Sequence, residues 1–515
     1  MTIFLYFCIR MKIFTSAQMH DWDQYTQEHE SISSADLTER ATKAMARAIT
    51  ERWNTSTPVV VFAGPGNNGA DALAVARLLA AAGYEVSVFL FNIHNKLSAS
   101  CAANRKRLAD EGRAKALTEI TVNFDPPQLT AATLVVDGLF GTGLDKPLAG
   151  GFASLVRYIN QSPAQVVSLD MPSGLMAEDN TYNIRTNIVR ADLTLTLQQP
   201  KLCMILADCQ QFIGQLHVLN TDLSPQYAAQ TEATCAIVEE DTLRELLRPR
   251  PDFAHKGTMG SALIVAGSMG MAGCAVLAAR ACLRSGVGKV AVRTPQCNNV
   301  IVQLGVPEAV VHLDPGDTCV TEPDDATPFD AIAIGPGIGR QETTAIAMIA
   351  QMRRAACPVV VDADALNILA CHRAWMQQLP SDVILTPHPG EFDRLAGSPS
   401  NGDYDRLHRC SDMATRLQVH IVLKGHRTAL CTPDGHIFFN TTGNSGMATA
   451  GCGDVLTGVI VALLARGYSP RDACLLGVYL HGAAGDLALN RTGKESLVAG
   501  DIIDHLPGAF RCLEG

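Results

Sequence analysis

The stretch Gly443–Gly458 reads G-N-S-G-M-A-T-A-G-C-G-D-V-L-T-G, a run of small residues with one carboxylate at the start of an apolar helix. Small side chains let the backbone approach a ligand closely, and the unpaired N–H groups of a helix start attract an anion. Asp454 would lie in the first helical turn, within reach of a phosphate or of a hydroxyl about to be phosphorylated. The pattern predicts a phosphoryl-transfer site with Asp454 as general base; an ordinary loop and helix cap is the alternative.

Three further motifs in the second half follow predicted strands. Ile334–Arg340 (IGPGIGR) is a glycine-rich turn, Val361–Asn367 (VDADALN) holds two carboxylates and an amide, and Leu385–Glu391 (LTPHPGE) fixes a histidine between two prolines. A fourth motif, Lys424–Thr428 (KGHRT), ends a strand with cations near where phosphates would lie. A capped helix start remains the alternative for VDADALN, and a basic surface turn for KGHRT.

The first half carries motifs of the same kind at three predicted strand ends. Val59–Ala63 runs into Gly64–Asp71 (GPGNNGAD), a second strand ends in Asp137 before Phe140–Pro147 (FGTGLDKP), and a third ends in Asp170 before the residues MPSG. GPGNNGAD lacks the Lys-Ser/Thr of a Walker loop and the spacing of the dinucleotide fingerprint. Its Asn and Asp side chains suit a polar ligand or a hard cation. Each motif alone could be a turn or a cap, but together they should converge on one crevice at the strand ends.

Parallel strands are needed to bring these motifs together, and the order of predicted strands and helices along the chain fits a parallel sheet. Short β-branched runs alternate with Ala/Leu-rich helical stretches such as Ala70–Ala82, a pattern typical of βαβ units. This alternation of strands and helices is interrupted near Thr221–Glu240. Further along the chain, Thr432–Gly435 (TPDG) contains the Asp-Gly pair that is typical of a hairpin turn. The predicted strands are Val59–Ala63, Tyr84–Phe91, Thr133–Asp137, Gln165–Asp170, Leu193–Leu197, Ala262–Ala266, Ala331–Ile334, Pro358–Asp362, Val383–Thr386 and Ile421–Lys424.

Length and composition agree with an α/β protein of two domains. With 515 residues the chain exceeds what one hydrophobic core usually serves. Its 47% hydrophobic and 18% charged residues describe a globular chain rather than a disordered one. We predict domains at residues 11–225 and 236–512, with residues 226–235 as the linker. The net charge of −10 argues against nucleic acid or an anionic membrane as a partner.

Cysteine usage and the first residues bear on the cellular location. Sixteen cysteines contain no C-x-x-C pair, which indicates neither a zinc site nor a disulfide framework. We expect free thiols in a reducing cytoplasm. Met1–Arg10 is apolar but too short to span a bilayer, and it lacks the features of a signal peptide. We therefore expect Met11 to be the functional beginning and expect no membrane association.

The first-half motifs G-N-N-G-x-D, V-D-x-L-F-G-T-G-L and L-D-x-P-S-G, in this order, resemble the NAD(P)H-hydrate epimerase domain over roughly residues 15–222. The resemblance implies a Rossmann-like αβα sandwich that interconverts the R and S epimers at C6 of hydrated NADH or NADPH. It implies that Asp170 touches the reacting ring as a catalytic residue, and that Asn68, Asp137 and Ser173 hold a potassium ion. The implied substrate-binding residues are Asn67, Asn68, Gly69, Ala70, Asp71, Gly141, Thr142, Gly143, Leu144, Asp145, Lys146, Pro147 and Asp170.

This activity makes chemical sense for a carboxylate site. The C6 hydroxyl is part of a hemiaminal, which epimerises by losing and regaining water or by ring opening. Either route needs a positioned acid or base. The family usually has glycine at the positions of Ala70 and Ala72, where a methyl could prevent a positive φ or a close backbone approach. A nucleotide-binding first domain without catalysis therefore stays open as an alternative.

The second-half motifs resemble the ADP- or ATP-dependent NAD(P)H-hydrate dehydratase domain, whose fold is ribokinase-like, over roughly residues 236–510. The resemblance implies that catalytic Asp454 deprotonates the C6 hydroxyl for phosphoryl transfer, after which phosphate leaves. Ala450 stands where the family usually has glycine. The implied site consists of Gly337, His388 and Asp454 for the hydrate, and Lys424, Gly425, His426, Arg427, Thr428 and Gly453 for the nucleotide.

The two resemblances together predict a bifunctional repair enzyme, in which the epimerase supplies the S epimer that the dehydratase accepts. Fusion of both domains in one chain implies ADP with Mg²⁺ as the phosphoryl donor, giving AMP and phosphate, and potassium for the epimerase. We expect small molecules as partners and a homo-oligomer. A ribokinase-like small-alcohol kinase is the main alternative, since it would share the site around Asp454.

Overall fold

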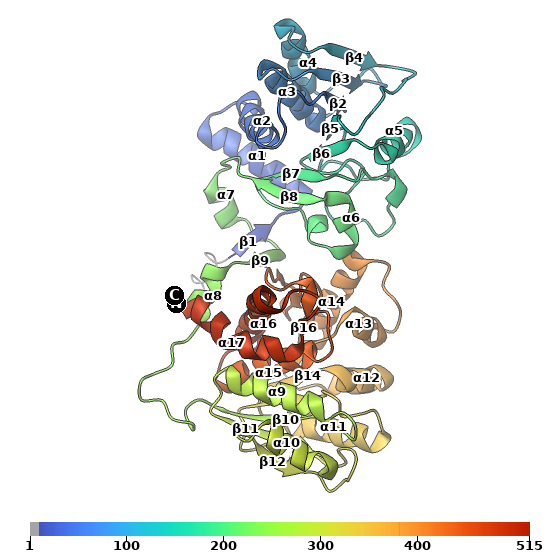
Figure 1. Ribbon diagram of the computed structural model, residues 1–515. Helices are drawn as coiled ribbons and strands as arrows, with labels where there is room; N and C mark the ends of the chain where they lie inside the picture. Colours follow the sequence, from blue (N-terminus) through green and yellow to red (C-terminus); the bar gives the residue numbers. More distant parts are fainter. Residues whose placement is uncertain (1–9, 381, 515) are drawn as a thin grey trace. The chain divides into compact units, whose positions relative to one another are not determined.

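The structure is a computed structural model that describes residues 10–380 and 382–514. It divides into two compact units. The N-terminal unit comprises Lys12–Ala233 with Gly402–Tyr404, and the C-terminal unit comprises Thr234–Asn401 and the residues from Asp405 onward, with Met11. Each unit is built around a β-sheet that helices cover (Figure 1), and this confirms the predicted α/β class. The predicted N-terminal extension lies outside the described residues, except for its last residue.

The N-terminal sheet has seven strands in the order β4-β3-β2-β5-β6-β7-β8, and all neighbours are parallel. Its strands are β2 (Val59–Ala63), β3 (Val86–Phe91), β4 (Ala116–Ile120), β5 (Leu134–Gly138), β6 (Gln165–Leu169), β7 (Leu193–Leu197) and β8 (Gln215–Leu219). The helices are α1 (Ser16–Glu30), α2 (Ser34–Thr50), α3 (Asn67–Ala81), α4 (Ala99–Glu111), α5 (Gly150–Gln161), α6 (Gln210–Ile213) and α7 (Pro225–Gln230), with short 3₁₀ turns η2 (Arg185–Asn187), η3 (Leu202–Met204) and η4 (Ala207–Cys209).

Alternating residues of strand β2 pack into cores on opposite faces of this sheet. Val59 and Val61 join residues of α2, α3 and α4 in one cluster, whereas Val60 and Phe62 join Val156 and other residues of α5 in a second cluster. Successive side chains of a strand point to opposite faces, so a strand covered on both faces reads as a continuous apolar run. This is why β2 has the sequence VVVFA with every residue buried.

The strand order determines where the motifs of this unit meet. From β2 the chain adds β3 and β4 on one side, and then β5 to β8 on the other. Ligands of open parallel sheets bind at such a reversal, beyond the carboxyl ends of the strands. The loops after β2 and β5, which carry GPGNNGAD and FGTGLDKP, therefore emerge side by side.

The C-terminal sheet has eleven strands in the order β1-β9-β18-β17-β16-β15-β14-β13-β10-β11-β12. They are β1 (Arg10–Ile13), β9 (Cys235–Val238), β10 (Ser261–Val265), β11 (Lys289–Thr294), β12 (Val310–Leu313), β13 (Ala331–Ile334), β14 (Val359–Val361), β15 (Val383–Leu385), β16 (His420–Leu423), β17 (Ala429–Cys431) and β18 (Ile437–Phe439). The helices are α8 (Glu240–Leu246), α9 (Ala272–Arg284), α10 (Asn299–Gly305), α11 (Glu342–Arg354), α12 (Ala363–Cys371), α13 (Pro389–Ala396), α14 (Asp403–Leu417), α15 (Cys452–Ala465), α16 (Pro470–Thr492) and α17 (Ala499–Glu514), with 3₁₀ turns η5 (Gln296–Asn298), η6 (Arg373–Gln378) and η7 (Ser445–Met447).

Two details of this sheet match the sequence predictions. β10 lies between β11 and β13, so the order reverses at β10 and β13, and the glycine-rich loop after β13 opens there. β17 and β18 form an antiparallel hairpin, and Gly435 in its turn has φ +85° and donates its N–H to the Thr432 carbonyl oxygen at 3.0 Å. The hairpin predicted at TPDG is therefore confirmed. All ten predicted strands are present, and their ends differ from the predicted ones by at most two residues.

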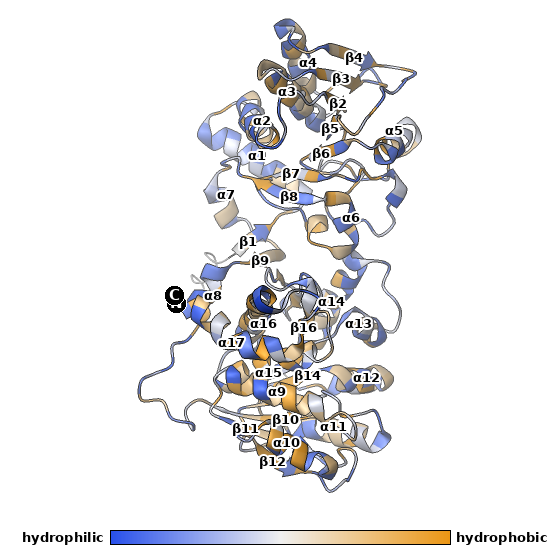
Figure 2. Ribbon diagram, viewed as in Figure 1, coloured by the Kyte–Doolittle hydropathy of each residue, from blue (hydrophilic) through white to orange (hydrophobic). Residues whose placement is uncertain are grey.

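Helix α15, which carries Asp454, is packed tightly into the core of the C-terminal unit. Its residues from Val455 to Ala465 are all buried, and α9, α16 and α17 contribute to the same cluster. Hydrophobic residues recur along α9 and α15 in Figure 2. A Cβ at Gly458 would lie 2.2 Å from the Ala278 carbonyl oxygen, so only glycine permits this approach of α15 to α9. The packing therefore fixes the position of Asp454, one turn earlier.

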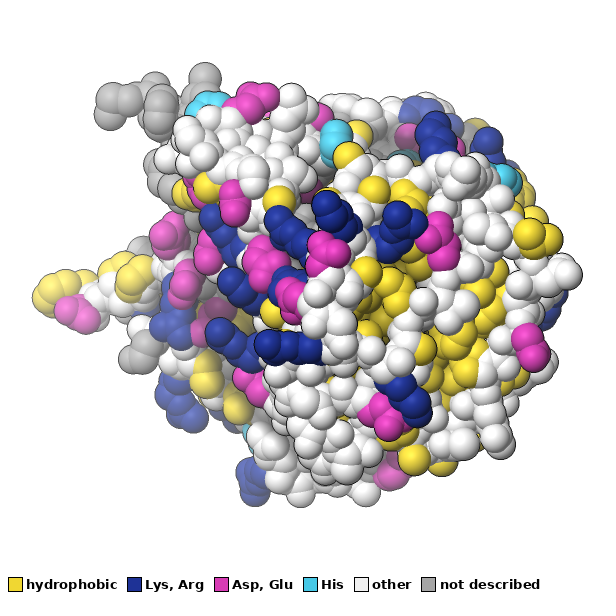
Figure 3. All heavy atoms as spheres, turned by 90° about the horizontal axis from the view of Figure 1, so that it is seen from above, with side chains coloured by type: hydrophobic (Ala, Val, Ile, Leu, Met, Phe, Trp, Pro, Cys, Tyr) yellow, Lys and Arg dark blue, Asp and Glu magenta, His cyan; other side chains and the backbone are white. Residues whose placement is uncertain are grey.

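The predicted linker, residues 226–235, carries most of α7 and the first residue of β9. On the face that Figure 3 shows, basic and acidic side chains are interspersed rather than separated by sign. In the described part of the chain, no helix is both long and apolar enough to cross a membrane.

Candidate active sites

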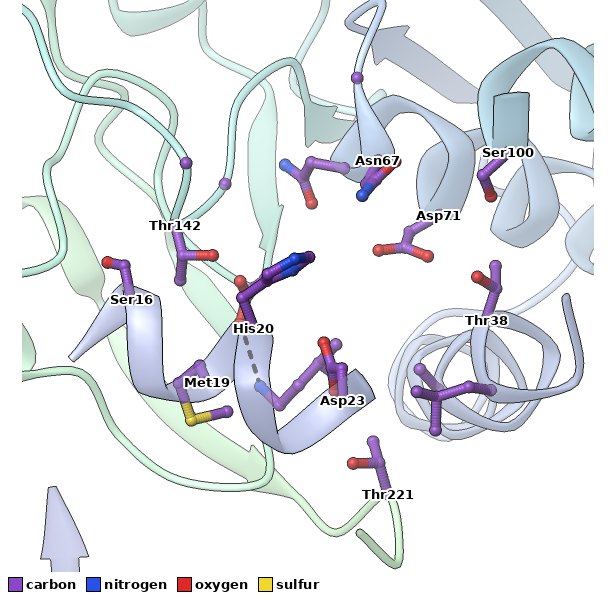
Figure 4. A pocket seen from close by; sticks show the side chains of 18 of the residues that line it. Ser16, Met19, His20, Asp23, Thr38, Asn67, Asp71, Ser100, Thr142 and Thr221 are labelled. Carbon is purple, nitrogen blue, oxygen red and sulfur yellow. Dashed lines mark hydrogen bonds between the residues drawn. The ribbon is translucent and has the colours of Figure 1, made fainter. Parts of the chain in front are cut away.

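The N-terminal unit contains a cavity of about 770 Å³ at the reversal of strand order. Loops that follow β2, β5, β6 and β7 line it, together with α1 and α2. Figure 4 shows Asn67, Asp71 and Thr142 around the same space. The three strand-end motifs thus meet in one cavity. The predicted substrate-binding residues that line it are Asn67, Asn68, Asp71, Gly141, Thr142, Gly143, Leu144 and Asp170.

Five other residues of the predicted set do not line the cavity. Gly69 lies beneath it, because a Cβ there would be 1.8 Å from the Gly64 carbonyl oxygen. Ala70 is fully buried, and its N–H already donates to the Gly66 carbonyl oxygen at 3.1 Å. Asp145, Lys146 and Pro147 are exposed beyond the lining. In this structure Gly69 and Ala70 therefore serve the packing of α3 on the sheet.

Asp170 is held in a fixed and strained position at the end of β6. Its backbone φ of +61° lies in the left-handed region, which non-glycine residues seldom adopt. Its Oδ1 accepts a hydrogen bond from Lys201 Nζ at 2.6 Å and a longer one from Leu197 N at 3.3 Å. The Lys201 side chain is 2% exposed, and its Nζ also donates to Thr196 Oγ1 at 2.8 Å. A buried ammonium thus holds the Asp170 carboxylate in one orientation.

Two more carboxylates, those of Asp23 and Asp71, share this cavity. Burial raises the pKa of Asp23 to about 6; the charge of Asp170 acts in the same direction, whereas Lys201 and His20 oppose it. Burial also raises the pKa of Asp71 well above its ordinary value, and the charges of Asp170 and Asp23 add to this effect. Neighbouring carboxylates disfavour each other's ionisation. The cavity can therefore hold a protonated carboxyl group, which acid catalysis requires.

Asp23, His20 and Lys201 were missed by the sequence analysis. Lys201 lies in the loop after β7, four residues beyond the end of that strand, so its place near a strand end could have marked it. Asp23 and His20 lie on α1, which precedes the first strand of the sheet, and no motif marks them. Figure 4 shows both side chains in the cavity opposite Asp71.

The residues predicted to bind potassium lie close together at this site. Asp137 is fully buried; its Oδ1 accepts a hydrogen bond from Ser173 Oγ at 2.5 Å, and its Oδ2 accepts from Ser168 Oγ at 2.8 Å. Burial raises the pKa of Asp137, and these hydrogen bonds offset only part of that rise. A Cβ at Gly141 would lie 3.3 Å from the Asn68 side chain. Among the described residues, neither polar atom of the buried Asn68 amide has a hydrogen-bond partner.

These observations fit a monovalent cation at this point. No ion pair in the described part of the chain involves the buried Asp137, and burial raises its pKa, so a cation here would favour its charged form. Burying an unpaired charge is costly, and a cation would offset that cost. The free Asn68 Oδ1 is the kind of oxygen that such an ion binds.

In the C-terminal unit, Asp454 lies in the first turn of α15, as predicted. Gly451 precedes the helix with φ +87°, and the Asp454 side chain is buried. Burial raises the pKa of Asp454 to about 6; the charge of Asp362 adds to this effect, and a hydrogen bond with Cys274 opposes it. The carboxylate can therefore change protonation state near neutral pH, as a general base must. Cys274, on the first turn of α9, was not predicted.

A buried ion pair lies next to Asp454. Lys424 Nζ donates to Asp362 Oδ1 at 2.8 Å, and Thr457 Oγ1 donates to Asp362 Oδ2 at 2.8 Å. Burial acts to lower the pKa of Lys424, but the charges of Asp362 and Glu391 outweigh it and raise that pKa. A Cβ at Gly453 would lie 3.3 Å from Lys424 Nζ. The helix start, the ammonium and Asp362 thus belong to one cluster.

His388 and Gly337 occupy defined positions at two strand ends. His388 caps α13, where its N–H donates to Glu391 Oε2 at 2.9 Å and its Nδ1 accepts from Gly390 N at 3.1 Å. Its side chain is 51% exposed, and its Nε2 lies 3.5 Å from Glu391 Oε1. Gly337 has φ +62°, and a Cβ there would lie 3.0 Å from Cys274 Sγ. Gly337 thus lies beside Cys274, which hydrogen-bonds with Asp454, and His388 contacts Glu391, whose Oε2 lies 3.9 Å from Lys424 Nζ.

The predicted nucleotide loop follows β16. Lys424 is half-buried, whereas Gly425, His426 and Arg427 are exposed. Thr428 Oγ1 donates to the Gly425 carbonyl oxygen at 3.0 Å, which closes the loop into a turn. The turn therefore presents backbone and cationic groups outward from Lys424.

The alanines that depart from the family pattern cause no strain in this structure. Ala70 and Ala72 lie within α3, and neither has a positive φ. The Ala72 methyl packs against β5, since a Cβ at Gly138 would lie 2.4 Å from it. Ala450 is exposed, and the left-handed position of that loop is taken by Gly451 instead. The methyl groups therefore block no backbone conformation that the loops require.

Comparison with known proteins matches both units. A family model described as NAD(P)H-hydrate dehydratase matches residues 262–508, and one described as YjeF-related protein N-terminus matches residues 34–203. Among solved structures, an ADP/ATP-dependent NAD(P)H-hydrate dehydratase from Bacillus subtilis, co-crystallised with ATP/Mg²⁺, is 37% identical. It covers 54% of this chain and 98% of its own, with a TM-score of 0.47.

Whole-length relatives join the two units in one protein. A bifunctional NAD(P)H-hydrate repair enzyme from Escherichia coli is 35% identical over 87% of this chain and 84% of its own length. Another from Moorella thermoacetica is 34% identical over 98% of this chain and 97% of its own length. By this likeness along nearly its whole length, the chain belongs to the family of bifunctional NAD(P)H-hydrate repair enzymes.

Proposed function

We propose that the C-terminal unit dehydrates the S epimer of hydrated NADH or NADPH at the expense of ADP. The observation that carries this proposal is the buried Asp454, with a pKa raised to about 6 by burial, at a helix start beside the Lys424–Asp362 pair. A carboxylate with this pKa can take a proton near neutral pH, and the helix start and the ammonium suit the phosphates.

The reaction has two steps. Asp454 takes the proton of the C6 hydroxyl while its oxygen bonds to the terminal phosphorus of ADP, and the bond from that phosphorus to AMP breaks. The C6–O bond then breaks with its electron pair on the leaving phosphate, and C5 gives a proton to water, which forms the C5–C6 double bond of the reduced cofactor. The second step is favourable because phosphate leaves far more readily than hydroxide.

We assign roles to the other predicted residues on the same basis. Lys424, the turn through Thr428 and the backbone at Gly453 would bind the nucleotide phosphates and sugar. His388 and Gly337 would contact the hydrate. Mg²⁺ would come with the nucleotide: the described residues contain no cluster of three His, Cys, Asp or Glu side chains that could hold a metal. Mg²⁺ commonly relies on one or two carboxylates with phosphates and water.

For the N-terminal unit we propose epimerisation of the same hydrates, with Asp170 as a catalytic residue. The cavity, the strained Asp170 backbone and its buried partner Lys201 support this role. Asn68, Asp137 and Ser173 would hold potassium, which would place a positive charge beside the substrate. The lining residues from Asn67 to Asp71 and from Gly141 to Leu144 would bind the nucleotide portion.

Hydrated NADPH tests both halves with the full chain. With the S epimer and ADP, we expect NADPH, AMP and phosphate in equal amounts, and ATP in place of ADP measures the donor preference. With the R epimer and no nucleotide, we expect conversion to S faster than the spontaneous rate. No NADPH would remove the dehydratase proposal and favour a small-alcohol kinase. Binding of the R epimer without faster conversion would favour a first domain that only binds.

We propose that residues 11–225 and 236–512 are the two functional domains, that the chain forms a homo-oligomer and that it acts in the cytoplasm. Every cysteine that the structure describes is a free thiol, in line with a reducing compartment. Light scattering of the purified protein would give its oligomeric state directly.

A further inference from the structure

Helix α1 contributes side chains to the cavity, although it carries none of the sequence motifs. Ser16, Met19, His20 and Asp23 all line the cavity, one or two helical turns apart. The family match to this unit begins at residue 34, beyond the end of α1. Figure 4 shows Asp23 and His20 facing the space opposite Asp71. This helix therefore brings an ionisable group to a site that the strand ends were expected to form alone.

Asp23 differs from Asp170 in the groups that surround its carboxylate. Asp170 accepts hydrogen bonds from Lys201 and from the Leu197 backbone. Among the described residues, no group donates a hydrogen bond to the Asp23 carboxylate. The charged groups that face Asp23 are Asp170 after β6, Lys201 after β7 and His20 on its own helix, and it also interacts with Asp71 on α3.

The two carboxylates therefore have different surroundings. The Lys201 ammonium holds Asp170 as a hydrogen-bond acceptor, whereas burial and the nearby charge of Asp170 favour the protonated form of Asp23 and raise its pKa to about 6. Pairs of titratable groups whose environments separate their protonation states are typical of acid–base sites. Burial and the charges of Asp170 and Asp23 raise the pKa of Asp71 well above its ordinary value, so Asp71 also favours its protonated form.

We propose that Asp23 is the catalytic acid and Asp170 the catalytic base of the epimerisation, with Lys201 as a positioning residue for Asp170. The inference rests on the epimerase function proposed above and names the second proton-transfer group of that site. Asp170 takes the proton of the C6 hydroxyl, and the electrons of that O–H bond form the carbonyl. The C6–N1 bond breaks with its pair on N1, and Asp23 protonates N1.

Ring opening leaves an aldehyde at C6 and an N–H at N1. Rotation about the C5–C6 bond turns the other face of the carbonyl toward N1. The reverse transfers then close the ring: N1 bonds to C6, its proton returns to Asp23, and the new alkoxide takes the proton from Asp170. Both carboxyl groups end in their starting states, so the cycle consumes no further reactant.

The test replaces Asp23 in the full chain and measures R-to-S conversion without nucleotide, corrected for the spontaneous rate. D23N should lose on the order of a hundred- to ten-thousandfold of the rate, the usual effect of removing a general acid. D23E, which keeps a carboxyl group, should retain more activity than D23N. The matched control is D21N, because Asp21 lies on the same helix, is exposed and does not line the cavity.

Two further readouts separate an acid from a structural residue. The wild-type rate should fall as pH rises through about 6, since the acid works only when protonated, and D23N should lack this fall. Dehydration of the S epimer with ADP should be unchanged in D23N, which shows that the C-terminal unit is folded, and unaltered binding of the R epimer by D23N shows that the cavity is intact. Epimerisation by D23N at the wild-type rate would overturn the inference. A wild-type chain that never epimerises would instead remove the proposed function itself.

Discussion

Replacing Asp454 with asparagine should abolish dehydration and at the same time stabilise the protein. Asn keeps the shape of the buried side chain but cannot take a proton. Removing a general base typically costs about a hundred- to ten-thousandfold in rate. The wild-type rate should rise as pH increases through about 6, because the base works only when ionised. NADPH formation from the S epimer and ADP, followed by absorbance, measures both effects.

The stability effect follows from the same raised pKa. Burial raises the pKa of Asp454 from 3.8 to about 6, so the folded chain binds this proton more tightly than the unfolded chain does. Below about pH 4 both states are protonated and the carboxyl costs nothing. Between 4 and 6 the unfolded chain ionises first, and stability falls as pH rises. Two units at about 1.4 kcal/mol each give a penalty of about 3 kcal/mol above pH 6.

D454N should remove that penalty. At pH 8 the variant should unfold at higher urea concentration or temperature than the wild type, by up to about 3 kcal/mol, and at pH 4 the two proteins should unfold alike. D412N is the matched control, because Asp412 is an exposed carboxylate on α14 of the same unit. Full dehydratase activity in D454N would refute the role of Asp454 as the base. A stability difference that does not change with pH would refute the raised pKa of Asp454 as its cause.

Three other substitutions test particular contacts. Lys424→Ala should destabilise the chain by about 3–5 kcal/mol, because it leaves the buried Asp362 unpaired. It should also raise the KM for ADP, because Lys424 is proposed to bind the nucleotide phosphates. Urea unfolding equal to that of the wild type would contradict the stability effect. Asn68→Leu should abolish activation of the epimerase by potassium salts while dehydration continues, and epimerisation that still responds to potassium would exclude Asn68 as a ligand. Ala70→Gly should lower stability by about 1 kcal/mol without raising the epimerisation rate; a faster variant would restore the view that this methyl obstructs the site.

Much of the architecture could be read from local patterns. Strands of a parallel sheet that are buried on both faces are continuous apolar runs, such as VVVFA in β2, and all ten predicted strands are present. The hairpin turn at Gly435 follows from a local backbone requirement. The strand order was not readable, because it depends on contacts between segments far apart in the sequence. The packing roles of Gly69 and Ala70 were also hidden, since both lie inside a motif otherwise directed at the cavity.

The sequence by itself determined the chemistry that this protein offers: small-residue loops at strand ends, each with Asp or Asn, and one carboxylate at the start of α15. These features are local, because a loop and a helix start need only their own residues. The tertiary structure alone decided which side chains meet and how they titrate. It places Asp23 of α1 and Lys201 beside Asp170, and it buries Asp454 beside Asp362. Burial and through-space charge set a pKa, and neither can be read from the order of residues.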